Sequence, residues 1–260
     1  MKILKNLSSM PQFKTSAIVI KTLDYGESDR ILTFYASDFG KIKGIAKGAK
    51  KSRRRFSNAL ELFTLSSLIF FDKRESGLVR IEGCDIVNAF PAIREDVRKF
   101  AYACYLVELV DEMTAEREPN PHLFSTVRTF LSLLNEGQTE AQILRVFEAR
   151  LLSLLGYRPE LSRCLRCGET LEHGGQAHFS VKKGGLLCES CAHGYGGLIP
   201  ISLGTAKILY HAMEMDLSKV GRLKFSSQAL HESEAILTQF IQYQINKELK
   251  SKKFLKDLGI

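Results

Sequence analysis

The first third of the chain alternates short apolar runs with polar turns. Apolar and β-branched residues bounded by turn residues predict β-strands joined by hairpins. The pattern predicts five strands, at 17–23, 30–35, 40–47, 60–71 and 78–83. Five short strands in one segment are typical of a small closed barrel such as the OB-fold, and an SH3-like barrel would give the same pattern.

After Pro91 the apolar period becomes helical. Apolar residues recur at steps of three and four from Val97 to Val110, which predicts a central helix. A Glu-Pro-Asn-Pro run and Gly137 then separate further apolar segments. The pattern predicts these helices at 122–134, 139–155, 203–215 and 227–249.

These patterns, together with the spacing of the cysteines, are interpreted as an α+β multidomain protein. An N-terminal five-stranded barrel, with the OB-fold as the preferred type, precedes a C-terminal helical domain that carries a four-cysteine zinc-ribbon insert. The expected segments are a flexible arm at 1–13, the barrel at 14–88, helical parts at 89–157 and 200–260, and the insert at 158–199. The last helical part ends in a basic tail with five lysines and one glutamate between Asn246 and Lys256. Such a tail is either a frayed helix end or an auxiliary contact for a polyanion.

Four of the six cysteines form two C-x-x-C pairs that are twenty residues apart: Cys164, Cys167, Cys188 and Cys191. This spacing predicts a zinc ribbon, in which each pair sits on a tight knuckle and four thiolates close a tetrahedral shell. A redox dithiol is the main alternative. Because four sulfurs leave no position for water or substrate, one bound Zn²⁺ would be structural. Three nearby histidines are expected to stay outside the metal shell: His173, His178 and His193.

The insert has few large apolar residues to build a core: Phe179, Val181, Leu186, Leu187 and Leu198. Metal binding would supply the missing folding free energy, on the order of 10 kcal/mol or more. The two remaining cysteines, Cys84 and Cys104, stand alone in apolar contexts and are expected to be core residues.

Composition describes an ordinary globular protein, with 45% apolar and 25% charged residues. The net charge of +8 is uneven, since residues 1–85 hold 16 Lys and Arg against 9 Asp and Glu, a net of +7. No apolar run approaches the roughly 18 to 20 residues of a membrane span, and the N-terminus lacks a signal-peptide core. We therefore expect a cytoplasmic protein with no membrane partner.

The stretch 40–56 gathers eight basic residues and no acidic ones. A strand would aim Lys41, Lys43 and Lys47 at one face of the sheet, followed by a cationic loop. This arrangement suits a nucleic-acid backbone, although a solvated basic hairpin is the plain alternative. Exposed aromatic residues would stack on unpaired bases, with Tyr25 and Phe56 as candidates. The candidate DNA-binding residues are Arg30, Lys41, Lys43, Lys47, Lys50, Lys51, Arg53, Arg54, Arg55 and Phe56.

An acidic cluster, Asp24, Glu27 and Asp29, lies between the first two predicted strands. It has the composition of a strand-to-strand turn, and in another setting it would bind Mg²⁺ for phosphoryl chemistry. The chain contains no G-x-x-x-x-G-K-[ST], G-x-G-x-x-G, H-E-x-x-H or G-x-S-x-G motif, which argues against an ATPase or a hydrolase. We expect no enzymatic activity and no small-molecule substrate.

Two runs carry a resemblance: Thr15-Ser-Ala-Ile-Val-Ile-Lys-Thr-Leu-Asp-Tyr-Gly-Glu-Ser-Asp-Arg-Ile-Leu-Thr-Phe34 and Gly40-Lys-Ile-Lys-Gly-Ile-Ala-Lys-Gly-Ala-Lys-Lys51. They closely resemble the N-terminus of the bacterial RecO family of DNA repair proteins. The order of barrel, helical domain and late cysteine insert agrees, so the resemblance spans nearly the whole chain. Some members of that family lack the cysteines, so their presence suggests a zinc-bearing branch with a mainly stabilising metal.

The resemblance implies a recombination mediator without enzymatic turnover. It would bind single- and double-stranded DNA, anneal complementary strands, and act with RecR to help RecA displace the single-strand binding protein SSB, with RecF as a further functional partner. The acidic SSB tail ends in apolar residues and would bind an apolar groove rimmed with Lys and Arg on the helical domain. In this hypothesis Lys41, Lys43 and Lys47 follow one DNA backbone while the loop 50–55 reaches a second.

Two rival functions stay open at this point. A zinc-ribbon protein of transcription or translation would bind a specific sequence or RNA and would not anneal strands. A metal-dependent nuclease would use Asp24, Glu27 and Asp29 and would cut labelled DNA in the presence of Mg²⁺ or Mn²⁺.

Overall fold

The structure is a computed structural model that describes residues 11–52, 55–56, 58–72, 77–138, 140–171 and 176–259. The chain divides into two compact units. The first unit combines the chain up to Pro91 with Thr114–Leu131, and the second combines Ala92–Met113 with the chain from Ser132 onward. No helix in the described ranges combines the length and the apolar character that a membrane crossing requires.

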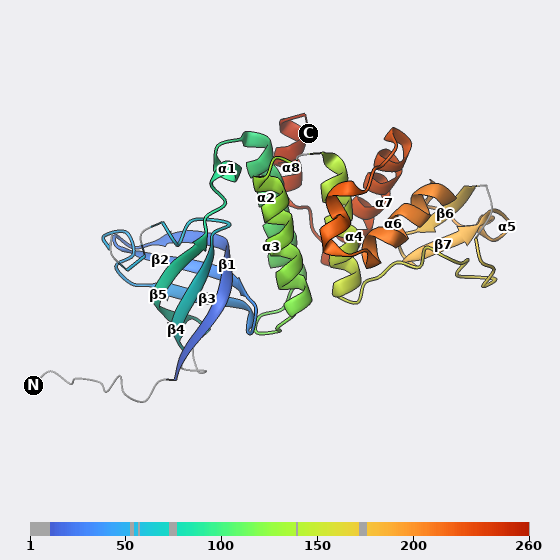
Figure 1. Ribbon diagram of the computed structural model, residues 1–260. Helices are drawn as coiled ribbons and strands as arrows, with labels where there is room; N and C mark the ends of the chain where they lie inside the picture. Colours follow the sequence, from blue (N-terminus) through green and yellow to red (C-terminus); the bar gives the residue numbers. More distant parts are fainter. Residues whose placement is uncertain are drawn as a thin grey trace, which may run out of the picture. The chain divides into compact units, whose positions relative to one another are not determined.

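The first unit contains a closed five-stranded barrel in the order β1-β2-β3-β5-β4 (Figure 1). Its strands are β1 (Gln12–Tyr25), β2 (Asp29–Ala36), β3 (Gly40–Ala46), β4 (Leu65–Phe71) and β5 (Val79–Asn88). Only the β3–β5 pairing is parallel, and the other four pairings are antiparallel. The expected OB-fold barrel is therefore confirmed.

Strand alternation fills the barrel interior. Leu32 and Phe34 of β2 face Gly44 and Ile42 of β3, and the three apolar side chains belong to one buried cluster. A glycine is required at position 44, because a Cβ there would lie 2.4 Å from Ile81 Cδ1, across the parallel β3–β5 contact. A glycine at this position therefore leaves room for the side chains of β5 inside the barrel.

Several strand boundaries differ from the prediction, and β5, for example, continues to Asn88 rather than ending at residue 83. β1 begins at Gln12, so it includes two residues that were assigned to the flexible arm. β4 begins at Leu65 rather than at residue 60, because Phe63 has a left-handed φ of 70° and Leu60 turns into the barrel core. The apolar run 60–71 therefore combines a strand with a turn that closes the barrel interior.

The second unit contains most of the helices: α2 (Val97–Met113), α4 (Ala141–Leu154), α6 (Leu203–Glu214), α7 (Ser227–Ile245) and α8 (Lys250–Asp257). The short α1 (Pro91–Arg94) and α3 (Pro121–Asn135) each straddle a boundary between the units. A 3-10 helix follows α6 at Leu217–Arg222. These elements confirm the predicted helical domain.

The basic tail is not a frayed extension of α7. Asn246 takes a left-handed φ of 52° and ends α7, and the chain re-enters helix as α8. The carboxylate of Glu108 on α2 accepts hydrogen bonds from the backbone N–H groups of Lys250 (3.0 Å) and Ser251 (2.7 Å). The first turn of α8 is thus capped by a side chain distant in sequence.

The cysteine insert forms a small sheet with strand order β7-β6-β8. Its elements are β6 (Gln176–Ser180), β7 (Gly185–Cys188), α5 (Glu189–Ala192) and β8 (Leu198–Ser202). Phe179 is buried and packs edge-on against Phe240 of α7, with ring centroids 5.6 Å apart. A helix of the same unit therefore completes the core that the insert cannot build alone.

Candidate nucleic-acid interface and metal centre

The loop after β3 is tied to the turn between β1 and β2. Gly26 supplies that turn with a φ of 58°, and Asp29 begins β2 immediately after it. The backbone N–H of Gly48 donates to Asp29 Oδ1 (2.8 Å), and the N–H of Lys50 donates to the carbonyl of Ser28 (3.0 Å). These two hydrogen bonds hold the described start of the basic loop against one end of the barrel.

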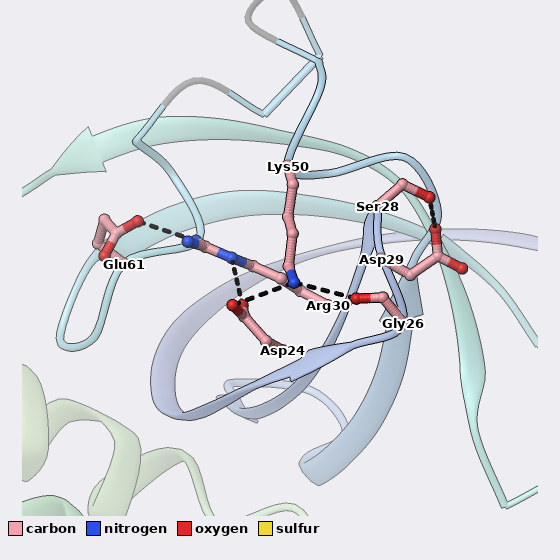
Figure 2. Close-up of polar contacts among 7 residues, drawn as sticks. All are labelled: Asp24, Gly26, Ser28, Asp29, Arg30, Lys50 and Glu61. Carbon is pink, nitrogen blue, oxygen red and sulfur yellow. Dashed lines mark hydrogen bonds and ion pairs between the residues drawn. The ribbon is translucent and has the colours of Figure 1, made fainter.

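Three charged side chains meet at this end of the barrel (Figure 2). Lys50 Nζ lies 3.1 Å from Asp24 Oδ2 and donates to the carbonyl of Gly26 at 3.1 Å. Arg30 Nε lies 3.3 Å from Asp24 Oδ1, and its Nη1 donates to Glu61 at 2.9 Å. The hydrogen bond from Lys50 lowers the pKa of Asp24, and the bond to Glu61 raises the pKa of Arg30. Two predicted DNA-binding cations are thus already held in place by carboxylates.

The acidic cluster of this turn is not arranged as a metal site. Asp24 pairs with cations, while Asp29 accepts from the Gly48 N–H, which lowers its pKa, and from the Ser28 hydroxyl. Among the described residues the cysteine quartet is the only grouping of three or more metal-ligating side chains. Asp24 lies in β1, Asp29 begins β2, and only Glu27 lies in the turn between them, so a hairpin role fits the structure better than the nuclease hypothesis.

The structure does not show the expected exposed face of lysines on β3. Lys41 is only 8% exposed, because Glu116 lies beside it in a parallel bridge and the Arg117 N–H donates to its carbonyl (2.9 Å). Lys43 is half-buried and its Nζ lies 2.5 Å from Glu116. Lys47 is exposed but follows the strand, in the turn. A segment distant in sequence covers the face that alternation alone had left open.

Phe56 is not an exposed stacking residue. Its side chain is 1% exposed and belongs to the barrel core. Arg55 lies over its ring, 5.0 Å from the centroid, and donates from Nη2 to the Lys47 carbonyl (2.7 Å). Tyr25, the other aromatic candidate, is 54% exposed at the end of β1, next to the β1–β2 turn.

The structure therefore gathers one group of the predicted cations at a single end of the barrel, which we call the cationic edge: Arg30, Lys47, Lys50, Lys51 and Arg55. Lys51 is exposed, and its N–H donates to the Gly48 carbonyl (3.1 Å). Two further predicted residues, Arg53 and Arg54, lie outside the described residues.

Sequence reasoning missed the residues that pair with these cations. Glu61 and Glu116 each contact a predicted DNA-binding side chain, Arg30 and Lys43 respectively. Both are distant in sequence from their partners, so no local pattern identifies the pairs. The only available signal was that acidic residues follow the central helix, in the run Glu116-Arg-Glu118.

The second site is the cysteine quartet. The Sγ atoms of all four cysteines lie within 4.8 Å of one another, and those of Cys167 and Cys188 are 3.8 Å apart. A tetrahedral Zn²⁺ with Zn–S bonds of about 2.3 Å needs sulfurs about 3.8 Å apart, so the donor set fits this ion. The four cysteines that the spacing predicted are therefore brought together in one cluster that could hold a metal ion.

Tight backbone turns position the thiols. In the first knuckle the Gly168 N–H donates to the Cys164 carbonyl (2.9 Å), with Gly168 at a φ of 75°. Burial disfavours the Cys164 thiolate, but N–H groups of Cys167, Cys188 and Arg166 outweigh it and lower the Cys164 pKa to about 6. A thiol so readily deprotonated is suited to metal ligation.

The nearby histidines lie outside this quartet where they are described. His178 is half-buried in β6, and His193 is exposed just after α5. Neither belongs to the group of side chains that could share an ion, as the sequence predicted. His173 lies outside the described residues.

Together these features define a class of protein in which an OB-fold barrel with a cationic edge is joined to a helical domain that carries a four-cysteine metal knuckle. Residues 10–90 match the family model described as Recombination protein O N terminal, and residues 94–253 match Recombination protein O C terminal.

Curated relatives named DNA repair protein RecO agree with this match. One from Syntrophus aciditrophicus (strain SB) is 42% identical over 94% of this chain and 95% of its own length. Another from Geobacter metallireducens is 36% identical over 96% of this chain and 99% of its own length, and one from Bacillus pumilus is 35% identical over 94% of each. The chain belongs to the RecO family.

Proposed function

We propose that this protein is a recombination mediator in DNA repair that binds single- and double-stranded DNA at the cationic edge of its barrel. The ordered group of Lys47, Lys50 and Arg55 at one end of an OB-fold is the observation that carries this proposal. OB-folds bind oligonucleotides through their strand faces and loops, and loop cations suit a phosphate backbone. The covered face of β3 shifts the proposed contact from Lys41 and Lys43 to this loop.

Binding at the cationic edge is an exchange of anions. Asp24 holds Lys50 and Arg30 at distances that a phosphate oxygen would also take. A DNA strand displaces this carboxylate from cations that are already positioned, so little side-chain ordering is needed. Exposed Tyr25 follows Asp24 at the end of β1 and can stack on an unpaired base.

Annealing follows from charge neutralisation. Two strands on one cationic surface repel each other less and meet at a higher local concentration. With RecR, the protein would help RecA to replace SSB on single-stranded DNA, with RecF as a further functional partner, and these partnerships rest on the family. This role places the protein in the cytoplasm at the nucleoid and requires no catalytic turnover.

A cavity in the second unit fits the acidic, apolar-ended tail of SSB. It has a volume of about 790 Å³ and is lined by side chains of α2, α4, α7 and α8. Leu144, Leu230 and Leu255 give it apolar walls, and Lys253 and Lys256 give it cations, whereas Lys252 pairs with Glu234, which also lines the cavity. Arg145 also lines it, with a side chain 6% exposed whose Nε and Nη1 lack hydrogen-bond partners among the described residues. Such donors suit a terminal carboxylate.

One structural Zn²⁺ is the proposed occupant of the cysteine quartet. Four thiolates close its coordination shell, so the metal stabilises the ribbon and leaves no position for a substrate. The two rival functions are less well supported. The family match disfavours a transcription or translation factor, and the ion pairs of Asp24 disfavour a nuclease.

The decisive experiment is the annealing of complementary DNA strands coated with SSB. The wild-type protein should accelerate annealing and leave both strands intact in the presence of Mg²⁺. A Lys47/Lys50/Lys51/Arg55→Ala variant should lose most of this activity, and its affinity for DNA should depend less steeply on salt.

A matched control replaces exposed cations of the second unit, as in Lys219/Lys224→Ala, and should anneal like the wild type. Equal affinity and salt slope in the wild type and the barrel variant would remove the cationic edge as the DNA contact. Fragmented strands would favour the nuclease instead.

A further inference from the structure

The zinc ribbon carries an exposed aromatic ring that has two cations close to it. Tyr195, which follows the second cysteine knuckle, is 39% exposed. The Arg166 guanidinium carbon lies 6.0 Å from its ring centroid, and Lys183 Nζ lies 5.0 Å from it. Arg166 comes from the first knuckle and Lys183 from the β6–β7 turn, so three separate segments of the ribbon converge on one ring.

Backbone hydrogen bonds hold these three segments in place. The Arg166 N–H donates to Cys164 Sγ (3.4 Å), and the Tyr195 N–H donates to the Ala192 carbonyl (3.1 Å). The Lys183 N–H donates to Ser180 Oγ (3.3 Å) within the turn. The cluster is therefore part of the ribbon's fold, and its geometry depends on the two cysteine knuckles.

The charge of this cluster is available to an external anion. Two other arginines of the ribbon region are neutralised, since Arg163 pairs with Glu160 (3.1 Å) and Arg158 pairs with Glu214 (2.7 Å). Among the described residues no carboxylate lies within ion-pair distance of Arg166 or Lys183. The adjacent Lys182 is also exposed and adds to the positive potential.

We propose that Tyr195, Arg166 and Lys183 form a second contact for unpaired nucleic acid, in which the ring stacks on a base and the cations bind the flanking phosphate. The ring selects single strands because the bases of a duplex are already stacked on each other. The cations supply the phosphate attraction common to all nucleic-acid surfaces. This inference rests on the proposed function, and it gives the ribbon a direct role beyond stabilising the fold.

The test uses the full-length protein with its zinc. Tyr195→Leu keeps an apolar side chain but removes the ring, and we expect its affinity for oligo-dT to fall about fivefold or more. Affinity for a blunt duplex should stay unchanged. Tyr157→Leu is the matched control, because Tyr157 is 42% exposed in the same unit and no cation of the described structure lies over its ring. It should bind both ligands like the wild type.

Two further measurements test the same contact if the Tyr195→Leu variant loses its zinc. An Arg166→Gln/Lys183→Gln variant should lower the salt slope for oligo-dT. Photocrosslinking of the wild type to an oligonucleotide with 5-iodouracil should label Tyr195. Normal oligo-dT binding by the zinc-loaded Tyr195→Leu variant, or crosslinks absent from the ribbon, would overturn the inference.

A different result would contradict the proposed function itself. It is wrong if the barrel variant Lys47/Lys50/Lys51/Arg55→Ala binds both DNA ligands like the wild type. If that variant loses both while Tyr195→Leu loses neither, only the ribbon contact is excluded.

Discussion

At the scale of single residues, the cationic edge is a set of ion pairs that the proposed DNA contact would open. Asp24 contacts both Lys50 and Arg30. Lys50 also donates to the Gly26 carbonyl, and Arg30 also donates to Glu61, so both cations keep a partner without Asp24. Asp24 is therefore a competitor for phosphate and not the sole support of these side chains.

Asp24→Asn should raise the affinity for single-stranded DNA by about threefold to tenfold at low salt, since it frees two cations without moving them. The log–log salt slope should steepen by about 0.7 for each additional phosphate that the protein neutralises. Because the pKa of Asp24 is lowered, its ion pairs are present above the ordinary pKa of aspartate and are lost only as pH falls through the lowered value. The competition is therefore at full strength at neutral pH.

Fluorescence anisotropy with labelled oligonucleotides over a series of salt concentrations measures both quantities. Asp85→Asn is the matched control, because Asp85 is exposed on the same barrel and is not paired with a cation in the described structure. If the affinities of the two variants rise equally, the effect is only the change of net charge and the competition model fails.

A second residue-scale feature is the buried charge cluster of the helical core. Arg145 Nη2 lies 3.0 Å from Glu148 Oε1, and the Tyr105 hydroxyl donates to the same carboxylate. The side chain of Glu148 is fully buried. Burial, followed by the Glu148 charge, raises the pKa of Tyr105 well above its ordinary value, so the hydroxyl remains a donor.

Glu148→Gln should lower the free energy of unfolding by about 3–5 kcal/mol, because it leaves the Arg145 charge buried without its partner. Glu112→Gln removes an exposed pair with Lys247 in the same unit and should cost less than about 1 kcal/mol. Since the chain has no tryptophan, urea unfolding is best followed by circular dichroism. Equal costs for the two variants would show that burial does not set the strength of the inner pair.

At the scale of elements, the segment 116–118 decides which barrel face is open. It lies along β3, and Arg117 pairs with buried Asp72 just after β4. Gly40 permits this approach, because it has a φ of 63° and a Cβ there would lie 2.1 Å from the Glu118 carbonyl oxygen. One glycine thus allows a distant segment to cover the lysine face.

Gly40→Ala should destabilise the first unit by about 2–4 kcal/mol, because it adds a backbone clash to the cost of a left-handed alanine. Gly26→Ala separates the two effects. Its φ of 58° is similar, but a Cβ there would meet nothing within 4 Å, so only the conformational cost of about 1 kcal/mol applies. Urea midpoints of the two variants give the comparison, and equal losses would show that segment 116–118 moves aside freely.

The elements also show which features of the fold the sequence can predict. The strands, the long helices and the cysteine quartet follow from alternation, helical period and ligand spacing, which are local patterns. The burial of Lys41 and the capping of α8 by Glu108 depend on partners 75 or more positions away in the chain. The ring of Phe56 was expected to be exposed because the residue follows a basic run, but the ring is buried in the barrel core. Such long-range packing carries no local signal.

At the scale of the whole molecule, charge and metal belong to different units. The cationic edge lies in the first unit, and the cysteine quartet lies in the second. The barrel has its own buried cluster, whereas the ribbon relies on Phe240 of α7 and on its knuckles. Loss of the metal should therefore act on one part of the molecule only.

Zinc removal should unfold the ribbon locally and leave the barrel folded. A Cys167→Ser/Cys191→Ser variant should contain no zinc and should lose amide protection in β6, β7 and α5, because metal binding supplies much of the ribbon's folding free energy. Protection in β1–β5 should be unchanged. Native-state hydrogen exchange with mass spectrometry resolves the two regions, and metal analysis should find one Zn²⁺ per wild-type chain.

Cys104→Ala is the control for cysteine replacement, since Cys104 lies on α2 outside the quartet. It should keep its zinc and its ribbon protection. The zinc-free variant should still bind duplex DNA at the cationic edge, because those residues belong to the barrel unit, which has its own buried core. Its affinity for oligo-dT should fall to the level of Tyr195→Leu, since the knuckles no longer position Arg166 beside the ring. Full ribbon protection without zinc would contradict the structural role of the metal.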